Sequence, residues 1–503
     1  MSENGETFGV RGARMLRVMT LDPESCFRAL RSRDPRFDGV LYVGVTSTGI
    51  YCRPVCTARP VRRENCRFFD NAASAEHSGF RPCLRCRPEL APGRSPVDAP
   101  SRTAARAVAR IEAGALNDGA VDDLAADLGL SARQLRRLVE REYGVSPVAL
   151  AQTRRLLLAK HLLTDSSLSM VDVAFASGFA SLRRFNTLFR DRYGLTPTNL
   201  RRRAGAPDPA DAIVLELGYR PPIEWRALLD FLAARATPGV EAVDGLRYRR
   251  TIAIGKHRGW IEVAPSTRAN SLRVRVAPTL ARALPPLLAK VRALFDLDAQ
   301  PAIIEEHLGA DPVLGPVVAK QRGLRVPGAI TGFEVALRAI LGQQVSVRAA
   351  TTIAGRIASA FGEPIETPFP ELTTLAPTAE RLAGLGDGEM SGFGLTGPRA
   401  KCVRTLAGAV VDGLLVLEAG ADPDATVERL EQLRGVGPWT AHYITMRALA
   451  WPDAFPHADL VLRKALGDAS PKVALDRSQA WRPWRAYAAM HLWRGYSHSQ
   501  NRD

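Results

Sequence analysis

In the middle of the chain, hydrophobic and polar positions repeat with an offset of 50 residues. Leu135 corresponds to Phe185, and Tyr143 corresponds to Tyr193. Within each copy the apolar residues lie three and four positions apart, which is the spacing of one face of an α-helix. Each copy opens with a serine, suited to an amino-terminal cap, and closes on a glycine, suited to a helix end. The pattern therefore predicts two equivalent amphipathic helices.

A short helix and a tight turn are predicted before each of these helices, from the words LAADLGL and VAFASGFA. Two helix-turn-helix units are therefore expected within residues 101–203. The polar faces of the two longer helices carry side chains of the types that read base edges and phosphates in a DNA major groove. These side chains are Arg133, Gln134, Arg136 and Arg137 in the first copy and Arg183, Arg184, Asn186 and Thr187 in the second. A plain helical bundle with solvated arginines is the alternative.

The carboxy-terminal region changes from a strand pattern to a helical pattern. The words RYRRTIAIG, GWIEVAP and SLRVRVAP predict an antiparallel sheet between Ile213 and about residue 280. Helices are predicted to dominate from about Gly332 onward. Stretches rich in Pro, Ala and Gly at 89–101 and 204–212 separate the modules.

Composition and charge narrow the class of protein. A chain of 503 residues is too long for one hydrophobic core. It has no apolar run as long as a membrane span, and its start lacks an apolar signal-peptide core, so we expect a cytoplasmic protein without membrane contact. The net charge is +16, of which residues 15–203 carry +12. This distribution favours double-stranded DNA as the partner, with a merely soluble basic surface as the alternative.

Four cysteines, Cys52, Cys56, Cys83 and Cys86, form two close pairs. Each pair can present two sulfurs to one tetrahedral Zn²⁺. Seven cysteines in a chain of this length fit a reducing compartment better than a disulfide framework. The arginines beside the pairs indicate a thiolate brought close to phosphate; they are Arg53, Arg81, Arg85 and Arg87. An inert structural zinc site and a zinc-thiolate redox sensor are the alternatives.

Residues from about 48 to 89, with the words TGIYCRP and GFRPCLRCRP, resemble the amino-terminal domain of the adaptive-response regulator Ada. The resemblance implies that the four cysteines bind zinc and that Cys52 accepts a methyl group from a methylphosphotriester in damaged DNA. Zinc keeps a thiol deprotonated, and the thiolate is the nucleophilic form. Arg53, beside Cys52, is expected to contact DNA.

The stretch SGFASLRRFNTLFRDRYGLTPTNLRR resembles the arabinose-regulator class of transcription factors. This resemblance implies activation of transcription, with RNA polymerase as a partner. The Ada family usually carries a second methyl-acceptor domain with a Pro-Cys-His-Arg word. The word is absent from this sequence, so direct reversal of O6-methylguanine is not expected.

The segment LRGVGPWTAHYITMRAL contains a Leu-x-Gly-Val-Gly hairpin between two predicted helices. Gly435 and Gly437 permit backbone N–H groups to approach a phosphate closely. Residues from about 215 to 493 resemble the helix-hairpin-helix superfamily of DNA glycosylases, and most closely DNA-3-methyladenine glycosylase II. The words YRPPIEWRALLDFLAARA, ALRAILGQQVSV and WRPWRAYAAMHLW also carry this resemblance.

The resemblance implies, by position, that Asp459 is the catalytic carboxylate. The aromatic residues expected to line the base pocket are Trp439, Tyr443, Trp493 and Phe231. An alkylated purine carries positive charge, which aromatic faces attract, and its departure leaves an oxocarbenium-like sugar that a carboxylate can stabilise. The base must first be flipped out of the duplex. Gln344 stands in place of the family's apolar wedge, and Leu460 and Arg494 replace aromatic residues of the pocket rim.

Two further features narrow the chemistry. Trp439 occupies the place of the lysine that forms a Schiff base in lyase-competent relatives, so simple hydrolysis without strand cleavage is expected. No cysteine follows Cys402, which excludes the iron–sulfur cluster of some relatives.

The alternative to a catalytic role for Asp459 is that it serves only as the amino-terminal cap of the helix LVLRKAL.

Together these inferences predict a multidomain α+β protein. Its parts are a disordered tail (1–14), a zinc-binding α/β domain (15–92), a linker (93–100), an all-α double helix-turn-helix domain (101–203), a linker (204–212), an antiparallel-sheet domain (213–320) and an all-α helix-hairpin-helix domain (321–503). The expected function is an adaptive response to DNA alkylation, in which one zinc-bound monomer accepts a methyl group, activates transcription and excises alkylated purines. The alternative is a transcriptional regulator whose last region binds DNA without catalysis.

Overall fold

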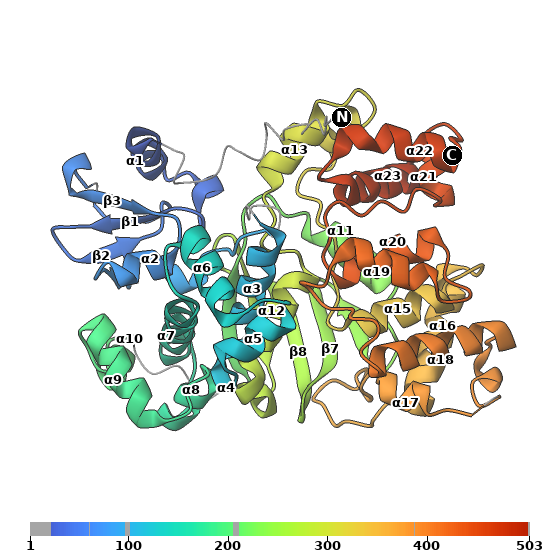
Figure 1. The fold of residues 1–503 in the computed structure, drawn as a ribbon, viewed down its shortest axis with the longest axis horizontal. Helices are drawn as coiled ribbons and strands as arrows, with labels where there is room; N and C mark the ends of the chain where they lie inside the picture. Colours follow the sequence, from blue (N-terminus) through green and yellow to red (C-terminus); the bar gives the residue numbers. More distant parts are fainter. Residues whose placement is uncertain (1–21, 60, 96–100, 205–210, 387, 501–503) are drawn as a thin grey trace.

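The computed structural model describes residues 22–59, 61–95, 101–204, 211–386 and 388–500. Four bodies follow one another in sequence order, coloured from blue to red in Figure 1. The expected tail, 1–14, lies outside the described residues, as do residues 96–100 and 205–210 of the two expected linkers. None of the described helices is both long enough and apolar enough to cross a membrane.

The first body is a small mixed sheet with two helices. Its elements are α1 (Pro23–Ser32), β1 (Tyr42–Val45), β2 (Ile50–Cys52), β3 (Cys66–Phe69), α2 (Ala72–His77) and β4 (Arg81–Pro82), with 3₁₀ turns η2 (Pro35–Phe37), η3 (Arg63–Asn65) and η4 (Pro88–Leu90). The strand order is β3-β1-β2-β4, and β4 runs parallel to β2. Because β2 and β4 are neighbours, Cys52 at the end of β2 lies close to Cys83, which follows β4. The expected zinc-binding α/β domain is confirmed as a fold.

The second body is all helical. It contains α3 (Arg102–Glu112), α4 (Ala115–Asp118), α5 (Val121–Asp127), α6 (Ala132–Tyr143), α7 (Pro147–Asp165), α8 (Met170–Ala176), α9 (Leu182–Tyr193) and α10 (Pro197–Ala204). The hydroxyls of Ser131 and Ser181 cap α6 and α9, and Gly144 and Gly194 end them at φ 70° and 67°. The predicted pair of helix-turn-helix units, α5–α6 and α8–α9, is confirmed.

The third body is built on a five-stranded antiparallel sheet. It contains β5 (Ile213–Gly218), α11 (Trp225–Ala233), β6 (Glu241–Asp244), β7 (Arg247–Ile254), β8 (His257–Pro265), β9 (Ser271–Val276), the 3₁₀ turn η6 (Pro278–Ala283) and α12 (Leu284–Leu294). The strand order is β5-β9-β8-β7-β6. The predicted sheet is confirmed. Helix α12 was not anticipated, because its two prolines resemble a helix breaker in the sequence, whereas the structure places them in the first turn, where no intrahelical N–H is needed.

The fourth body is a helical domain, shown in yellow to red in Figure 1. It contains α13 (Pro301–Gly309), α14 (Gly315–Lys320), α15 (Gly332–Leu341), α16 (Val347–Phe361), α17 (Ala379–Ala383), η7 (Ser391–Phe393), α18 (Gly397–Val411), α19 (Pro423–Glu431), α20 (Pro438–Ala448), α21 (Leu460–Ala465), α22 (Pro471–Arg477), η8 (Ser478–Trp481) and α23 (Arg485–Gln500). The hairpin predicted around Gly435 joins α19 to α20, as expected from the sequence.

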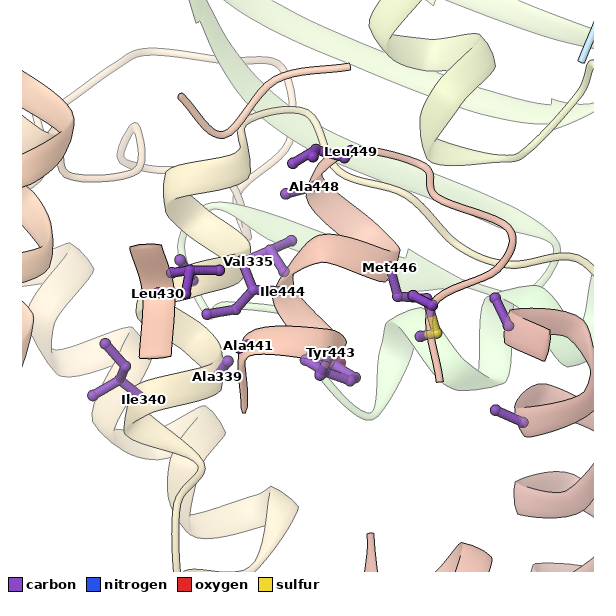
Figure 2. Packing of buried hydrophobic residues seen from close by; sticks show 14 of the residues in the cluster. Val335, Ala339, Ile340, Leu430, Ala441, Tyr443, Ile444, Met446, Ala448 and Leu449 are labelled. Atoms are coloured by element: carbon purple, nitrogen blue, oxygen red, sulfur yellow. The ribbon is translucent and has the colours of Figure 1, made fainter. Parts of the chain in front are cut away.

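Helices α15 and α20 cross at the centre of this domain. Figure 2 shows Ala339 of α15 beside Ala441 of α20, with Val335 and Ile444 one turn away. All four side chains are buried. Small side chains at the crossing let the two backbones approach, which fixes the start of α20 and the hairpin before it.

The second, all-helical body and the third, sheet-containing body share one hydrophobic cluster. It runs from Leu156 of α7 and Phe185 of α9 to Ile213 of β5 and Trp225 of α11. Helix α7 also reaches the sheet through a polar contact, because the backbone N–H of Glu216 donates to Nε2 of His161 at 3.2 Å. The second helix-turn-helix unit is therefore packed against the sheet-containing body.

Buried charges join the first body to α7. The Nζ of Lys160, on a side chain only 1% exposed, donates to Glu89 at 2.6 Å. Burial raises the pKa of Glu89, but the positive charges of Lys160 and Arg87 outweigh it and hold the pKa below its usual value. Arg87 also donates to Asp165, at 2.9 Å, at the end of α7. The zinc-binding body is therefore held to α7 by largely buried pairs of opposite charges.

A close backbone contact between the ends of β5 and η4 generates a test of this joint. A Cβ added at Gly218 would lie 2.0 Å from the carbonyl oxygen of Leu90. We expect Gly218→Ala to destabilise the protein by about 1–3 kcal/mol, measured by thermal unfolding, because backbone must move to admit the methyl group.

The matched control is Gly408→Ala within α18, where an added Cβ meets no atom within 4 Å. Alanine has the higher helix propensity, so this variant should be stabilised by up to ~1 kcal/mol. Equal stability of the two variants would contradict the close contact at Gly218.

Candidate active site and zinc centre

The carboxylate of Asp459 is held by three donors. Asp459 is the amino-terminal cap of α21, and its Oδ1 accepts from the backbone N–H of Leu462 at 2.9 Å. The indole N–H of Trp439 donates to Oδ2 at 2.8 Å, and that of Trp493 donates to Oδ1 at 3.0 Å. The three donors come from α20, α21 and α23, so the carboxylate is oriented by the packing of three helices.

Aromatic rings surround this carboxylate. Trp439 lies in the first turn of α20, and Tyr443 follows one turn later, so the two rings stack with centroids 5.6 Å apart and an interplanar angle of 16°. Trp493 meets Tyr443 edge-on at 6.3 Å. Phe231, on α11 of the sheet-containing body, packs against the same helical core. The structure thus brings together the residues that the sequence assigned to the base pocket, although their contacts with a base stay predictions.

Two arginines of this site were not predicted. Arg447 lies one turn after Tyr443 on α20, and its Nη1 donates to the Tyr443 hydroxyl at 3.1 Å. Its guanidinium lies 5.2 Å from the centroid of the Phe231 ring, and that of Arg235 lies 3.8 Å from the same ring. A buried arginine within the apolar segment YITMRALA was the available signal, because such a charge requires partners.

Arg447 is fully engaged by the protein. Besides the phenol, its Nε donates to the carbonyl of Pro327 at 2.9 Å and its Nη2 to the carbonyl of Gly328 at 3.0 Å. Burial raises the pKa of Tyr443, but the guanidinium groups of Arg447 and Arg235 outweigh it and lower the pKa to about 8. The phenol therefore titrates close to neutral pH.

The hairpin and the turn after α15 are bound to one another. Gly435 has φ 100°, a backbone conformation that side-chain-bearing residues rarely adopt. Its carbonyl accepts from Nε2 of Gln343 at 2.8 Å. Gln344, the next residue, is exposed and itself has φ 56°. Gly437 is exposed as well, so the residues predicted to contact DNA lie at the surface on linked segments.

Leu460 and Arg494, predicted to replace aromatic residues of the pocket rim, are next in sequence to Asp459 and Trp493. Leu460, the first residue of α21, is 60% exposed. Arg494, next to Trp493 on α23, is partly exposed. An exposed leucine and an arginine therefore stand beside the carboxylate and indoles of the site.

The four predicted metal ligands converge. The sulfur atoms of Cys52, Cys56, Cys83 and Cys86 all lie within 4.8 Å of one another. A tetrahedral zinc ion with bonds of about 2.3 Å to sulfur requires its ligands to be this close. A set of four thiolates is soft, closed and without an oxygen ligand, which selects zinc over calcium or magnesium. The donor set therefore fits zinc.

The arginines near the cysteines have different surroundings. Arg53 donates through Nε to Asp38 at 2.8 Å and through Nη1 to the carbonyl of Cys86 at 3.1 Å. Arg87 is bound to Glu89 and Asp165. Only Arg85, among these three, is exposed. The contact of Arg53 with DNA stays a prediction, and the structure gives this arginine a second role in fixing the zinc loop.

The polar faces of α6 and α9 are exposed in the same pattern. The predicted base-reading residues Arg133, Gln134, Arg136, Arg137, Arg183, Arg184, Asn186 and Thr187 are all exposed. Gln134 also completes the cap of α6, because its Oε1 accepts from the backbone N–H of Ser131 at 2.8 Å. Among the described residues, none covers these two polar faces, which leaves them accessible to a DNA groove.

Comparison with protein families divides the chain in the same way. Residues 25–89 match the metal binding domain of Ada, and residues 124–203 match a helix-turn-helix domain. Residues 214–331 match the AlkA N-terminal domain. Residues 337–470 match the HhH-GPD superfamily of base excision DNA repair proteins.

One similar protein spans nearly the whole chain, and others match parts of it. A protein of Mycobacterium tuberculosis described as a probable bifunctional transcriptional activator/DNA repair enzyme AlkA is 41% identical, over 95% of this chain and 98% of that protein. DNA-3-methyladenine glycosylase 2 of Escherichia coli is 34% identical, over 55% of this chain and 95% of the enzyme. The bifunctional transcriptional activator/DNA repair enzyme Ada of Escherichia coli is 44% identical, over 15% of this chain and 22% of that protein.

The environment of Tyr443 generates a test by ultraviolet titration. Subtracting the titration of Tyr443→Phe from that of the wild type should leave one phenol ionising near pH 8. Arg447→Met should raise this pKa, because it removes a positive charge and a hydrogen bond to the phenolate. Identical titrations of the wild type and Tyr443→Phe below about pH 9 would contradict the assignment.

The lowered pKa of Tyr443 also predicts that the stability of the fold depends on pH. The pKa of Tyr443 is lower in the folded chain than in the unfolded one, so its ionisation stabilises the fold. The wild type should therefore gain stability relative to Tyr443→Phe as pH rises from about 8 to about 10, the usual pKa of tyrosine. Denaturant unfolding of both proteins across this range measures the difference.

Proposed function

Because the chain belongs to the AlkA family of bifunctional transcriptional activators and DNA repair enzymes, we propose that Asp459 and Cys52 carry its two repair reactions. The chain joins a zinc-binding Ada module and a helix-turn-helix module to a DNA glycosylase. The glycosylase hydrolyses the N-glycosidic bond of alkylated purines such as 3-methyladenine. The zinc module takes a methyl group from a DNA methylphosphotriester, and the helix-turn-helix module then binds a promoter.

The observation that carries the glycosylase proposal is the hydrogen bonding of Asp459. A carboxylate offers about four acceptor positions. Three are filled by the N–H groups of Leu462, Trp439 and Trp493. The remaining position can hold a water molecule or face the sugar of an extruded nucleotide. Orientation by rigid indoles keeps this negative charge in place before the reaction begins.

The reaction proceeds by loss of the purine. The bond between C1′ and the base nitrogen breaks, and the base leaves with the electron pair. Positive charge develops on the sugar, where the Asp459 carboxylate stabilises it. Water adds to C1′ and gives up its proton to the carboxylate or to solvent. The stacked rings of Trp439 and Tyr443 hold the cationic base before it leaves.

We propose hydrolysis without strand cleavage. Trp439 stands at the hairpin where a lysine would be needed to form a Schiff base with the sugar. The indole N–H of Trp439 donates to Asp459, so Trp439 contributes by orienting that carboxylate. The product is an abasic site in an intact strand.

The hairpin and the turn after α15 are proposed to bind DNA on either side of the lesion. Gly435 and Gly437 give the phosphate access to backbone N–H groups. Gln344 is exposed on the segment that Gln343 ties to the hairpin, so it can enter the stack as the base leaves. Unstacking a damaged base costs a few kcal/mol, which these contacts offset.

Cys52 is the proposed methyl acceptor. Its sulfur attacks the methyl carbon, the bond from that carbon to the phosphate oxygen breaks, and a phosphodiester anion leaves. Zinc, when bound, keeps the thiols of the cluster deprotonated. Backbone N–H groups donate to other sulfurs of the cluster, from Arg53 to Cys86 and from Ala58 to Cys56. Hydrogen-bonded thiolates are weaker nucleophiles, which favours Cys52.

Methyl transfer changes the charge next to DNA. Four thiolates around one Zn²⁺ carry a net charge of about −2, which becomes about −1 when one is converted to a thioether. Repulsion of the DNA phosphates falls, so affinity for a promoter rises in a manner that depends on salt. The chain acts as a monomer, because α6 and α9 already supply two recognition helices. As an activator it binds RNA polymerase.

The catalytic role of Asp459 predicts a separation of stability from activity. Asparagine caps helices as well as aspartate does, so Asp459→Asn should fold normally. Release of 3-methyladenine from methylated duplex DNA should fall at least about a hundredfold, because the charge that stabilises the sugar cation is lost. The measurement is single-turnover base release at saturating enzyme.

The control for Asp459→Asn is Asp476→Asn, which removes an exposed carboxylate from the neighbouring helix α22. This variant should release base at the wild-type rate. Near-normal release by Asp459→Asn would rule out the aspartate as catalyst. Absence of release by the wild type itself would favour a DNA-binding region without catalysis.

The methyl-acceptor role of Cys52 predicts where the methyl group is found. After incubation with DNA carrying methylphosphotriesters, peptide mass spectrometry of the wild type should place one methyl group on Cys52. Cys52→Ala should gain neither the methyl group nor the increase in promoter affinity. Cys86→Ala is the matched control, because it also removes one zinc ligand but keeps the acceptor. A methyl group on another cysteine would contradict the assignment.

A further inference from the structure

One short helix of the zinc module touches the ends of both recognition helices. Helix α2 lies beside α6 and α7 in Figure 1. At its first turn, Nδ2 of Asn71 and Oγ of Ser74 donate to the carbonyl oxygen of Tyr143, at 2.9 and 2.8 Å. Tyr143 is the last residue of α6. The carboxy-terminal end of the first recognition helix is therefore bound to the start of α2.

The next turn of α2 reaches the second recognition helix. Glu76 is only 4% exposed, and its Oε1 accepts from the hydroxyl of Tyr193 at 3.3 Å. Tyr193 is the last residue of α9 and occupies the same place in its repeat as Tyr143 in the other. Equivalent ends of the two recognition helices are thus held by residues only a few positions apart.

The same carboxylate is connected to the zinc cluster. Oε1 of Glu76 also accepts from the hydroxyl of Tyr51 at 3.0 Å, and Tyr51 immediately precedes Cys52 in β2. Oε2 accepts from Thr153 of α7 at 2.9 Å. A continuous series of covalent and hydrogen bonds therefore runs from the sulfur of Cys52 through Glu76 to the end of α9.

The environment of Glu76 is costly for a group with only a packing role. Its hydrogen-bond partners are three hydroxyl groups and no cation. Burial raises its pKa to about 7, although the hydroxyls of Thr153 and Tyr51 and the charge of Arg192 act in the opposite direction. The titratable groups that face it are Tyr51 from β2 and Tyr193 and Arg192 from α9. A buried carboxylate of this kind destabilises the fold unless its partners stay in place.

We propose that α2 is the positioning element for promoter recognition, with Ser74 and Asn71 fixing the end of α6 and Glu76 fixing the end of α9. The inference rests on the proposed promoter binding and deepens it. Two recognition helices read half-sites whose separation mirrors the distance between the helices. Holding both ends on one rigid turn sets that distance. A change at Cys52 then reaches α9 through Tyr51 and Glu76.

If the contacts of α2 served stability alone, breaking them would lower thermal stability and total DNA affinity. The preference for one spacing between half-sites would not change. Spacing preference is therefore the informative measurement. DNA for it is obtained by selecting the tightest sequences from a random pool with the methylated full-length protein. One base pair is then inserted between the two half-sites.

The test compares Tyr193→Phe with its repeat-equivalent control, Tyr143→Phe. Tyr193→Phe keeps the ring that packs on Phe189 at 4.8 Å and removes only the hydroxyl that Glu76 accepts from. Tyr143→Phe removes a hydroxyl from the equivalent position but keeps the carbonyl that α2 binds. Base release, zinc content and methyl transfer should match the wild type in both variants.

The wild type and Tyr143→Phe should bind the selected site at least about tenfold more tightly than the site with the inserted base pair. Tyr193→Phe should bind the two sites with less than about threefold difference. It should also lose about tenfold of the affinity gained on methylation, as expected for a lost hydrogen bond to a buried carboxylate. Unchanged spacing preference in Tyr193→Phe would overturn the inference.

Two further measurements keep the outcomes distinct. Ser74→Ala removes one of the hydrogen bonds to Tyr143 without changing Glu76, and it should also reduce the spacing preference.

A double-mutant cycle of Tyr51→Phe and Tyr193→Phe should show that the two losses in methylation response are not additive. Additive losses would overturn the connection to Cys52. If the wild type fails to gain promoter affinity on methylation, the proposed switch is wrong, while the spacing measurement still decides the role of α2.

Discussion

The requirement that a buried charge be paired governs how this chain is assembled. Lys160 lies in the middle of α7 with its side chain 1% exposed, and an ammonium group in such a place is tolerated only beside a carboxylate. Glu89 of the zinc module supplies that carboxylate. Separating the zinc module from α7 would leave both charges unpaired in an apolar environment. The zinc centre is therefore held at a defined place relative to the recognition helices that flank α7.

The aromatic cluster beside Asp459 follows the same rule. Arg447 is buried on α20 and finds its acceptors in the carbonyls of Pro327 and Gly328 and in the phenol of Tyr443. These contacts tie α20 to the segment between α14 and α15. They also place a guanidinium beside the rings of Phe231 and Tyr443. The guanidinium in turn lowers the pKa of Tyr443, because it stabilises the phenolate.

The sequence predicted the local parts of the molecule and the residue types of its sites. A 3.6-residue period with serine and glycine at its ends was sufficient for α6 and α9, and strand alternation was sufficient for β7 to β9. It did not predict α12, which carries two prolines in its first turn. It also missed Arg447 and Arg235, since a charge in an apolar helix does not reveal which distant carbonyls or rings will pair with it.

What the amino-acid sequence determined by itself is everything that depends on neighbours along the chain: helix periods, caps, the spacing of the cysteine pairs and the hairpin glycines. Only the tertiary structure decided which residues far apart in the sequence bind the same side chain. Glu76 accepts from Tyr51, Thr153 and Tyr193, which lie 25, 77 and 117 positions away. Hydrogen bonds act over about 3 Å in space, and no periodic pattern records a contact formed when three elements pack around one buried carboxylate.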